Sequence, residues 1–258
     1  MMAWFKTECA VCGGETALLT RMKIADGVIC EACANRLSPW FRDYLGATAD
    51  EIRAQLAYRE ENRKKLANFH MTKAYGLKKY PDAIQFIVDE EARQFVCVEG
   101  PAETYKDRNP DVFDYRDVTD VMLEIDEGWS EDGAQYAVAK HESLTQDKYE
   151  EVFWRYDCWL TISVRHPFVQ EIRYKLNWKP AVIQVPQRGA MYRRGLDIGG
   201  EYRREDFAEL IGRLEALMAE DGPEAAIFDA FHEPLYRKKV DHILNHVRRA
   251  AHIANLLV

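Results

Sequence analysis

The chain carries Cys9-Ala10-Val11-Cys12 and, after seventeen intervening residues, Cys30-Glu31-Ala32-Cys33. This spacing is typical of a tetrahedral zinc site, because two residues between paired cysteines let one tight turn present both sulfurs to one ion. Gly13 and Gly14 follow the first pair and suit the sharp backbone of such a turn. We therefore predict one structural Zn²⁺ held by Cys9, Cys12, Cys30 and Cys33, which leaves no coordination position open for catalysis.

Two disulfides or four unligated core thiols are the alternatives to a zinc site. No apolar stretch follows Met1, so we expect no secretory signal and a reducing cytoplasm, where disulfides are disfavoured. A lobe of roughly 40 residues also buries too little apolar surface to fold unaided. Zinc binding would supply about 10–16 kcal/mol of folding free energy, as in isolated zinc-finger peptides. Zinc is therefore the favoured interpretation.

The residues between and after the pairs predict the local structure of this lobe. Asp26-Gly27 lies between two apolar runs and is a strong signal for a tight hairpin turn. Residues 34–37, which follow Cys33, are compatible with a helix. A knuckle, a hairpin and a helix that begins at the second pair form a treble-clef or zinc-ribbon arrangement.

The C-x-x-C-G-G knuckle, the Asp26-Gly27 turn and Ile29-Cys30-x-x-Cys33 followed by Leu37 resemble a known family. It is the short bacterial zinc-ribbon domain of unknown function that stands at the amino terminus of many uncharacterised proteins. The similarity continues to about residue 76, through residues 49–52 and 58–62, Phe69 and Lys73. The resemblance implies the zinc-ribbon fold, its cysteine ligands and a pleckstrin-homology-like β segment downstream, but it implies no activity.

Composition limits the class of protein. The chain of 258 residues has an ordinary apolar fraction and a formal net charge of -8, which argues against general nucleic-acid binding through cationic contacts with phosphate. No apolar run approaches the roughly 18 residues of a membrane-spanning helix, so we predict no transmembrane segment.

Hydrophobic periodicity predicts an α+β fold. Thr48 and Glu51 form a capping box for a charged helix from about 49 to 69, whose apolar stripe is thin. From Ala83 the period changes to two, with a hairpin at 84–98 and a long strand at 152–164. Apolar residues at helical spacing return at 207–217 and after Pro223, with an interruption expected at Pro234. We predict four parts: a zinc ribbon (1–46), a helical linker (47–80), an antiparallel β domain with a capping helix (81–222) and a C-terminal amphipathic helical region (223–258).

Other residues with chemical potential have simpler interpretations. The acid-rich residues 111–132 lack the ligand register of an EF-hand loop and are best explained as solvated loops and strand edges. Cys97 and Cys158 fall on apolar strand faces, which favours core packing over a thiol nucleophile paired with His141 or His166.

Two alternatives to a scaffold function come from the second half of the chain. The basic segments 186–204 and 235–252 could bind nucleic acid or an anionic surface, although an exposed Arg/Gly-rich loop and internal packing explain them more simply. His242 and His246 lie four apart and could serve a metal-dependent hydrolase, but Ile243-Leu244-Asn245 supplies no general-base glutamate.

These observations predict a cytoplasmic, zinc-binding, non-catalytic interaction or scaffold protein. We expect no catalytic residue set, a protein partner, and a homo-oligomer contact through the C-terminal helix as a further option.

Overall fold

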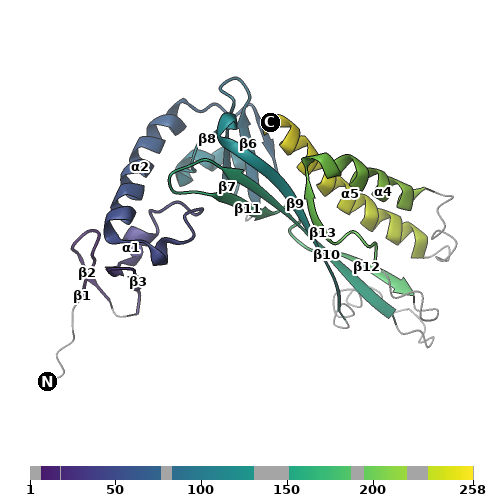
Figure 1. Ribbon diagram of the computed structural model, residues 1–258, viewed down its shortest axis with the longest axis horizontal. Helices are drawn as coiled ribbons and strands as arrows, with labels where there is room; N and C mark the ends of the chain where they lie inside the picture. Colours follow the sequence, from purple (N-terminus) through teal and green to yellow (C-terminus); the bar gives the residue numbers. More distant parts are fainter. Residues whose placement is uncertain are drawn as a thin grey trace. The chain divides into compact units, whose positions relative to one another are not determined.

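The computed structural model describes residues 7–17, 19–76, 83–130, 151–186, 195–219 and 232–257. They form helices and several antiparallel sheets, as predicted for an α+β fold (Figure 1). The chain divides into two compact units: unit 1 comprises Met1–Asp117 and Val164–Ile172, and unit 2 comprises Val118–Ser163 and Arg173–Val258. Within the described ranges, no helix combines the length and the apolar character that crossing a membrane requires.

Unit 1 begins with a small cysteine-bearing lobe. Two short antiparallel pairs come first, followed by a one-turn helix: β1 (Thr7–Glu8) with β2 (Glu15–Thr16), β3 (Met22–Ile24) with β4 (Gly27–Ile29), and α1 (Glu31–Ala34). The second hairpin turns at Ala25-Asp26, one residue earlier than predicted, because Gly27 already pairs with Ile24. Gly27 is needed for close packing, since a Cβ atom there would lie 2.9 Å from the Cβ of Ala10.

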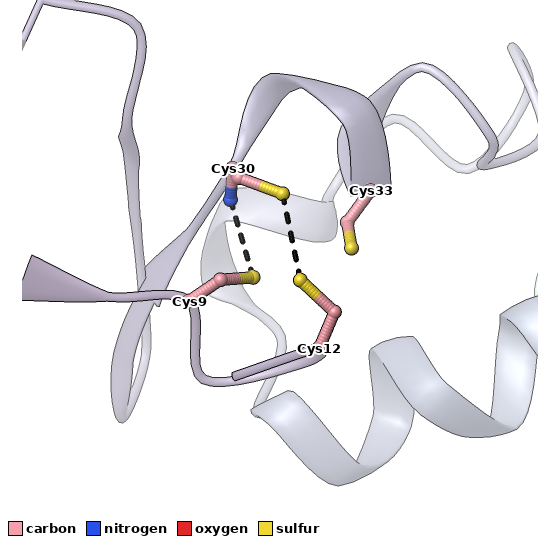
Figure 2. A group of neighbouring side chains, drawn as sticks. All are labelled: Cys9, Cys12, Cys30 and Cys33. Carbon is pink, nitrogen blue, oxygen red and sulfur yellow. Dashed lines mark hydrogen bonds between the residues drawn. The ribbon is translucent and has the colours of Figure 1, made fainter. Parts of the chain in front are cut away.

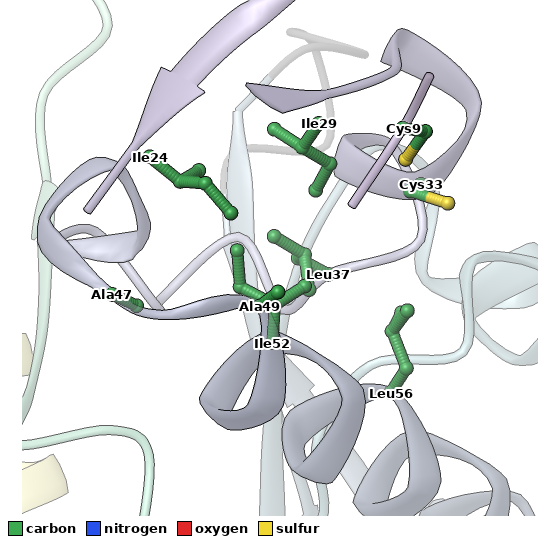
Figure 3. Packing of buried hydrophobic residues seen from close by; sticks show 9 residues of the cluster. All are labelled: Cys9, Ile24, Ile29, Cys33, Leu37, Ala47, Ala49, Ile52 and Leu56. Atoms are coloured by element: carbon green, nitrogen blue, oxygen red, sulfur yellow. The ribbon is translucent and has the colours of Figure 1, made fainter. Parts of the chain in front are cut away.

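Helix α2 (Ala49–Asn68) follows the 3-10 turn η1 (Tyr44–Gly46) and begins with the predicted capping box. Thr48 accepts a hydrogen bond from the backbone N–H of Glu51, and the Glu51 carboxylate accepts one from Thr48 in return. Figure 3 shows Ile52 and Leu56 of α2 packed in one cluster with Ile24, Ile29 and Leu37 of the lobe. The first half of α2 therefore belongs to the core of the cysteine lobe.

The second half of α2 packs on a four-stranded antiparallel sheet. Its strands lie in the order β5 (Lys73–Tyr75), β6 (Ile84–Asp89), β7 (Gln94–Glu99) and β8 (Phe113–Asp114), with the 3-10 turns η2 (Ala102–Arg108) and η3 (Tyr115–Asp117) nearby in sequence. Leu66 and Phe69 share a core with Ile87 and Val96 of the predicted hairpin. Helix α2 thus contributes to two hydrophobic clusters of unit 1.

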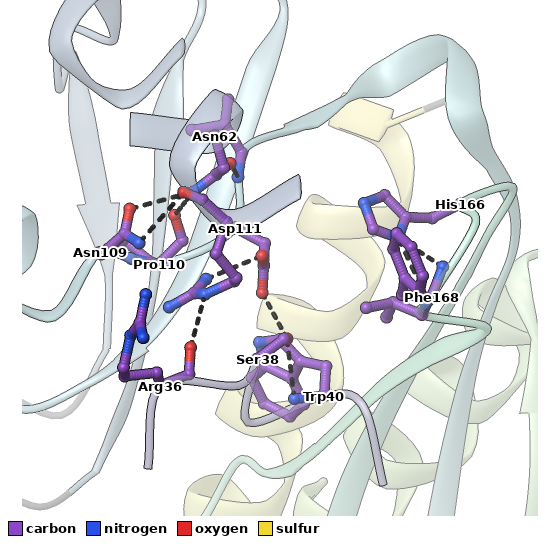
Figure 4. A network of polar contacts seen from close by, with 12 residues as sticks. Arg36, Ser38, Trp40, Asn62, Asn109, Pro110, Asp111, His166 and Phe168 are labelled. Atoms are coloured by element: carbon purple, nitrogen blue, oxygen red, sulfur yellow. Dashed lines mark hydrogen bonds and ion pairs between the residues drawn. The ribbon is translucent and has the colours of Figure 1, made fainter. Parts of the chain in front are cut away.

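Helix α2 has few buried apolar residues, and polar side chains are buried between them (Figure 4). Arg59 donates to Asp111 over 2.8 Å, and both side chains are almost fully buried. Ser38 donates to the other carboxylate oxygen of Asp111. Asn62 donates to the carbonyl oxygen of Pro110, and its own amide oxygen accepts from the N–H of Val112. The expectation that Asp111 lies in a solvated loop is wrong, because this aspartate is the buried counter-ion of Arg59.

Unit 2 is built around one sheet with helices against it. The sheet has the order β11 (Glu171–Lys175), β10 (Glu151–Val164), β9 (Val118–Ser130) and β13 (Gly200–Arg203), and β12 (Ala181–Pro186) also pairs with β10. Tyr156, Cys158, Leu160 and Ile162 on β10 are all buried, as the alternation predicts. After η4 (Arg204–Asp206), α4 (Phe207–Met218) packs beside α5 (His232–Leu257), which also contacts β9 and β12.

The interruption expected at Pro234 is not found, because α5 begins at His232 and Pro234 stands in its first turn. Proline is tolerated there, since the first backbone N–H groups of a helix have no partner within it. The end of the expected helical linker, residues 77–80, and the start of the C-terminal region at 223 lie outside the described residues, so the four-part division stays a prediction.

Candidate metal centre

Four sulfur atoms converge at one end of unit 1. Cys9 and Cys12 come from the turn between β1 and β2, Cys30 follows β4, and Cys33 lies in α1, as Figure 2 shows. All four sulfur atoms lie within 4.8 Å of one another. Among the described residues, no other group of three or more histidine, cysteine or acidic side chains has ligand atoms placed to hold a metal ion.

The spacing of the sulfurs fits a tetrahedral metal site. Metal–sulfur bonds of about 2.3 Å at tetrahedral angles place neighbouring sulfurs about 3.8 Å apart. The Sγ atoms of Cys12 and Cys30 are 3.8 Å apart, far longer than the roughly 2.05 Å of a disulfide bond. All four cysteines are free thiols in this structure. Four sulfur donors at this spacing therefore suit a metal ion, and the four cysteines form no disulfide bonds in this structure.

Backbone groups prepare this cluster for negative charge. Burial raises the pKa of the Cys9 thiol, but hydrogen bonds from the backbone N–H groups of Cys12, Cys30 and Val11 outweigh it and lower this pKa to about 6. The N–H of Cys30 lies 3.3 Å from the Cys9 sulfur. Burial raises the pKa of Cys33, and contacts with the other cysteines raise it further. A cation at the centre would remove this mutual repulsion and let all four sulfurs ionise.

The knuckle owes its shape to local hydrogen bonds. The N–H of Gly13 donates to the carbonyl of Cys9 over 2.8 Å, and the N–H of Cys9 donates to the carbonyl of Gly14 over the same distance. Gly13 has a φ of +72°, which confirms the expected need for glycine in this turn. The N–H of Ala10 donates to the carbonyl of Val28, so the knuckle is joined to the β3–β4 hairpin.

Helix α2 is joined to the cysteine lobe by contacts of Arg53 and Asp26, neither of which the sequence pattern singled out for this role. Arg53 donates to the backbone carbonyls of Ala10 and Val11 and also pairs with Asp50. The Asp26 carboxylate accepts a 2.8 Å hydrogen bond from the N–H of Ala49, at the start of the helix. No short-range signal marks these contacts with the lobe, because Arg53 and the carbonyls of Ala10 and Val11, like Asp26 and Ala49, lie more than twenty positions apart in the sequence.

The two remaining cysteines are not members of this cluster. Cys97 and Cys158 are each 1% exposed, and burial raises the pKa of both thiols. They therefore lack the thiolate character of a nucleophile, in agreement with the core-packing interpretation. His166 lies in unit 1 whereas Cys158 lies in unit 2, and His141 lies outside the described residues. The imidazole Nδ1 of His166 accepts hydrogen bonds from the N–H groups of Phe168 and Val169, which gives it a role in its own turn.

In the described part of the Arg/Gly-rich segment 186–204, backbone N–H groups bind the carboxylate of a glutamate from β9. The Glu127 carboxylate accepts 2.7 Å hydrogen bonds from the N–H groups of Ile198 and Gly199, with further donors at Asp197 and the Tyr156 hydroxyl. A cavity of about 710 Å³ beside it is lined in part by Glu124, Asp126 and Glu201. This arrangement stabilises a carboxylate of the protein itself. Arg188, Arg193 and Arg194 lie outside the described residues.

His242 and His246 do lie together on α5, with their Nε2 atoms 3.3 Å apart. His246 is 2% exposed, and burial, the neighbouring His242 and Arg249 lower its pKa to about 3. The pair has no third histidine, cysteine or acidic ligand close enough among the described residues to form a larger metal group.

Comparison with known proteins bears on the cysteine lobe. The model of a family described as "Domain of unknown function (DUF4428)" matches residues 7–55, which include all four cysteines and the capping box of α2. The match ends inside α2, short of the resemblance expected to about residue 76. The search of curated proteins found no match, and the search of solved structures found none. Residues 7–55 thus fit a small amino-terminal domain of unknown function with zinc-ribbon-like cysteines.

Proposed function

We propose that this protein is a zinc-binding, non-catalytic interaction or scaffold protein, in which Cys9, Cys12, Cys30 and Cys33 hold one structural Zn²⁺. The observation that carries the proposal is the convergence of four sulfurs within 4.8 Å. Four thiolates favour Zn²⁺ over harder cations and fill its tetrahedral shell. Zinc at this position has no free coordination site for water or substrate, so its contribution is to the folding of the lobe.

Metal content tests the zinc part of the proposal. Full-length protein prepared with zinc should contain one Zn²⁺ per chain, and replacement by Co²⁺ should give the thiolate charge-transfer bands of a tetrahedral cysteine site. Cys12→Ser should reduce the zinc content well below one per chain, whereas Cys97→Ala removes a distant thiol and should leave it unchanged. Less than one zinc in the wild-type protein, or equal loss in both variants, would count against the proposal.

A groove beside the metal centre supports the interaction part of the proposal. It has a volume of about 510 Å³ and is lined by β1, the knuckle and the β3–β4 hairpin, and its lining includes the charged residues Glu8, Arg21 and Lys23. A protein segment with apolar and acidic side chains would suit this surface. Partner capture and cross-linking should weaken in Lys23→Glu and persist in the control Lys64→Glu on α2. Equal capture by both variants would place the partner elsewhere.

Location and assembly belong to the same proposal. A reducing cytoplasm suits a cluster of free thiols. A homo-oligomer through α5 would have to use the solvent side of the helix, because Val240, Ile243, Leu244 and Val247 are buried within unit 2. Sedimentation of the wild-type protein over a concentration range tests this contact.

Nucleic-acid or anionic-surface binding and a metal-dependent hydrolase stay as alternative hypotheses. Binding to phosphate should weaken steeply as salt is added, so a salt titration with DNA, RNA and anionic vesicles distinguishes the first alternative from a scaffold. Hydrolysis that is lost in His242→Ala but kept in Cys12→Ser would favour the second.

A further inference from the structure

A pair of histidines on α5 has the geometry of two metal ligands, well separated in sequence from the cysteine cluster. His242 and His246 lie one helical turn apart, so their side chains share a face. Their rings meet edge to face with centroids 4.6 Å apart, and the two Nε2 atoms approach to 3.3 Å. His246 is buried while His242 is exposed, so the pair can be reached from solvent on one side.

We propose that His242 and His246 form a second, weaker site for a transition metal ion in unit 2, with water in the remaining coordination positions. Metal–nitrogen bonds of about 2.0–2.1 Å at tetrahedral angles place two nitrogens about 3.3–3.4 Å apart. The observed separation of 3.3 Å between the two Nε2 atoms matches this requirement. Imidazole nitrogens suit Zn²⁺, Ni²⁺ and Cu²⁺, so the site would take a borderline cation of this class.

Three features make the site weaker than the cysteine cluster. Only two protein atoms bind the ion. The positive charges of Lys239 and Arg249 act on His242 and oppose a dication. A ring bound through Nε2 also carries its proton on Nδ1, and the Nδ1 of His246 is buried without a hydrogen-bond partner among the described residues. In the absence of metal, the pair can share one proton between the Nε2 atoms instead.

The experiment uses the full-length protein already loaded with one Zn²⁺, so that the cysteine cluster is filled. Ni²⁺ is titrated calorimetrically near neutral pH, and free zinc is measured before and after. The wild-type protein should bind one Ni²⁺ per chain without releasing zinc. Because outer-shell partners of a metal already contribute about 10–100-fold in affinity, loss of a direct ligand in His242→Ala should weaken Ni²⁺ binding by about tenfold or more.

His252→Ala is the matched control, since His252 is an exposed histidine on the same helix but lies outside the pair. It should bind Ni²⁺ like the wild-type protein. Ni²⁺ should also raise the melting temperature of the wild type and of His252→Ala, but not that of His242→Ala, because a ligand of the folded state alone stabilises it. Equal Ni²⁺ affinity in the wild type and His242→Ala, no Ni²⁺ binding, or release of one zinc per bound Ni²⁺ would overturn the proposal.

Discussion

Replacing Cys12 by serine should unfold the cysteine lobe without a direct packing defect. The Cys12 side chain is exposed, so the substitution removes almost no buried contact. On the zinc proposal, the effect of the substitution acts through loss of the metal ligand. A structural zinc ion contributes on the order of 10–16 kcal/mol to folding, which equals or exceeds the roughly 5–15 kcal/mol net stability of a typical domain. The lobe has no reserve of comparable size, because its core contains few large side chains.

The unfolding should stop within α2. Ile52 and Leu56 pack on the lobe, and each would lose about 1.5–3 kcal/mol of burial when the lobe opens. Leu66 and Phe69 pack on the β6–β7 hairpin and keep their contacts. Arg59 keeps its ion pair with Asp111. The helix should therefore fray from its amino terminus to about residue 58 and remain folded beyond it.

Hydrogen exchange read by mass spectrometry, together with zinc content, measures this pattern. Peptides from residues 7–56 should lose protection in Cys12→Ser, whereas peptides covering β6 and β7 should keep it. Cys97→Ala is the control: it removes a buried thiol from β7, should cost about 1 kcal/mol, and should leave zinc content and lobe protection intact. Retention of one tightly bound zinc and of wild-type protection in Cys12→Ser would refute the reasoning.

Three further outcomes are expected. Asp111→Asn leaves the buried Arg59 cation without a counter-ion and should lower the free energy of unfolding by about 3–5 kcal/mol in denaturant titrations. Glu60→Gln, which removes a carboxylate from an exposed ion pair, should lower it by less than about 1 kcal/mol. Similar losses in the two variants would contradict the buried ion pair. Glu127→Gln replaces the carboxylate that accepts from the backbone N–H groups of Ile198 and Gly199, and should lower the free energy of unfolding by about 1–3 kcal/mol. Hydrogen exchange at these two backbone N–H groups should become faster, and unchanged exchange would argue against the carboxylate's role. Burial lowers the pKa of His166 in the folded protein, where its Nδ1 accepts two backbone hydrogen bonds. In the unfolded chain His166 has the ordinary histidine pKa of about 6.5, so below that pH the unfolded state binds more protons than the folded state. Stability should therefore fall as pH drops from about 6.5 towards the folded pKa, and denaturant midpoints should show a shallower fall in His166→Asn.

Short-range spacing was sufficient to predict the parts of the fold that local chemistry controls. The two C-x-x-C pairs identify a converging sulfur cluster, because a turn of fixed length places both sulfurs of a pair on one side. Thr48 and Glu51 identify the start of α2, since both partners of the capping box lie within one turn. The alternation along β10 likewise identifies its buried face.

Turn position and helix interruption were less predictable. The Asp26-Gly27 dipeptide predicts a turn at that site, yet Gly27 pairs with Ile24 in β4, and the close approach of Ala10 leaves no room for a side chain there. Pro234 predicts a break only if the helix has already begun, and α5 begins just before it. In both cases the residue type alone did not fix where the element begins: the pairing of Gly27 and the start of α5 at His232 decided it.

The amino-acid sequence by itself determined the cysteine cluster, the cap of α2 and the strand faces, because these follow from regular spacings within a C-x-x-C pair, within one helical turn and along one strand. Tertiary structure alone decided that Asp111 is buried against Arg59, that Glu127 fills the backbone cradle at residues 197–199, and that Arg53 supports the knuckle. These partners lie about 40 to 70 positions apart in the sequence. A charged side chain has the same local pattern whether water or a distant counter-ion surrounds it, and only the folded chain distinguishes the two.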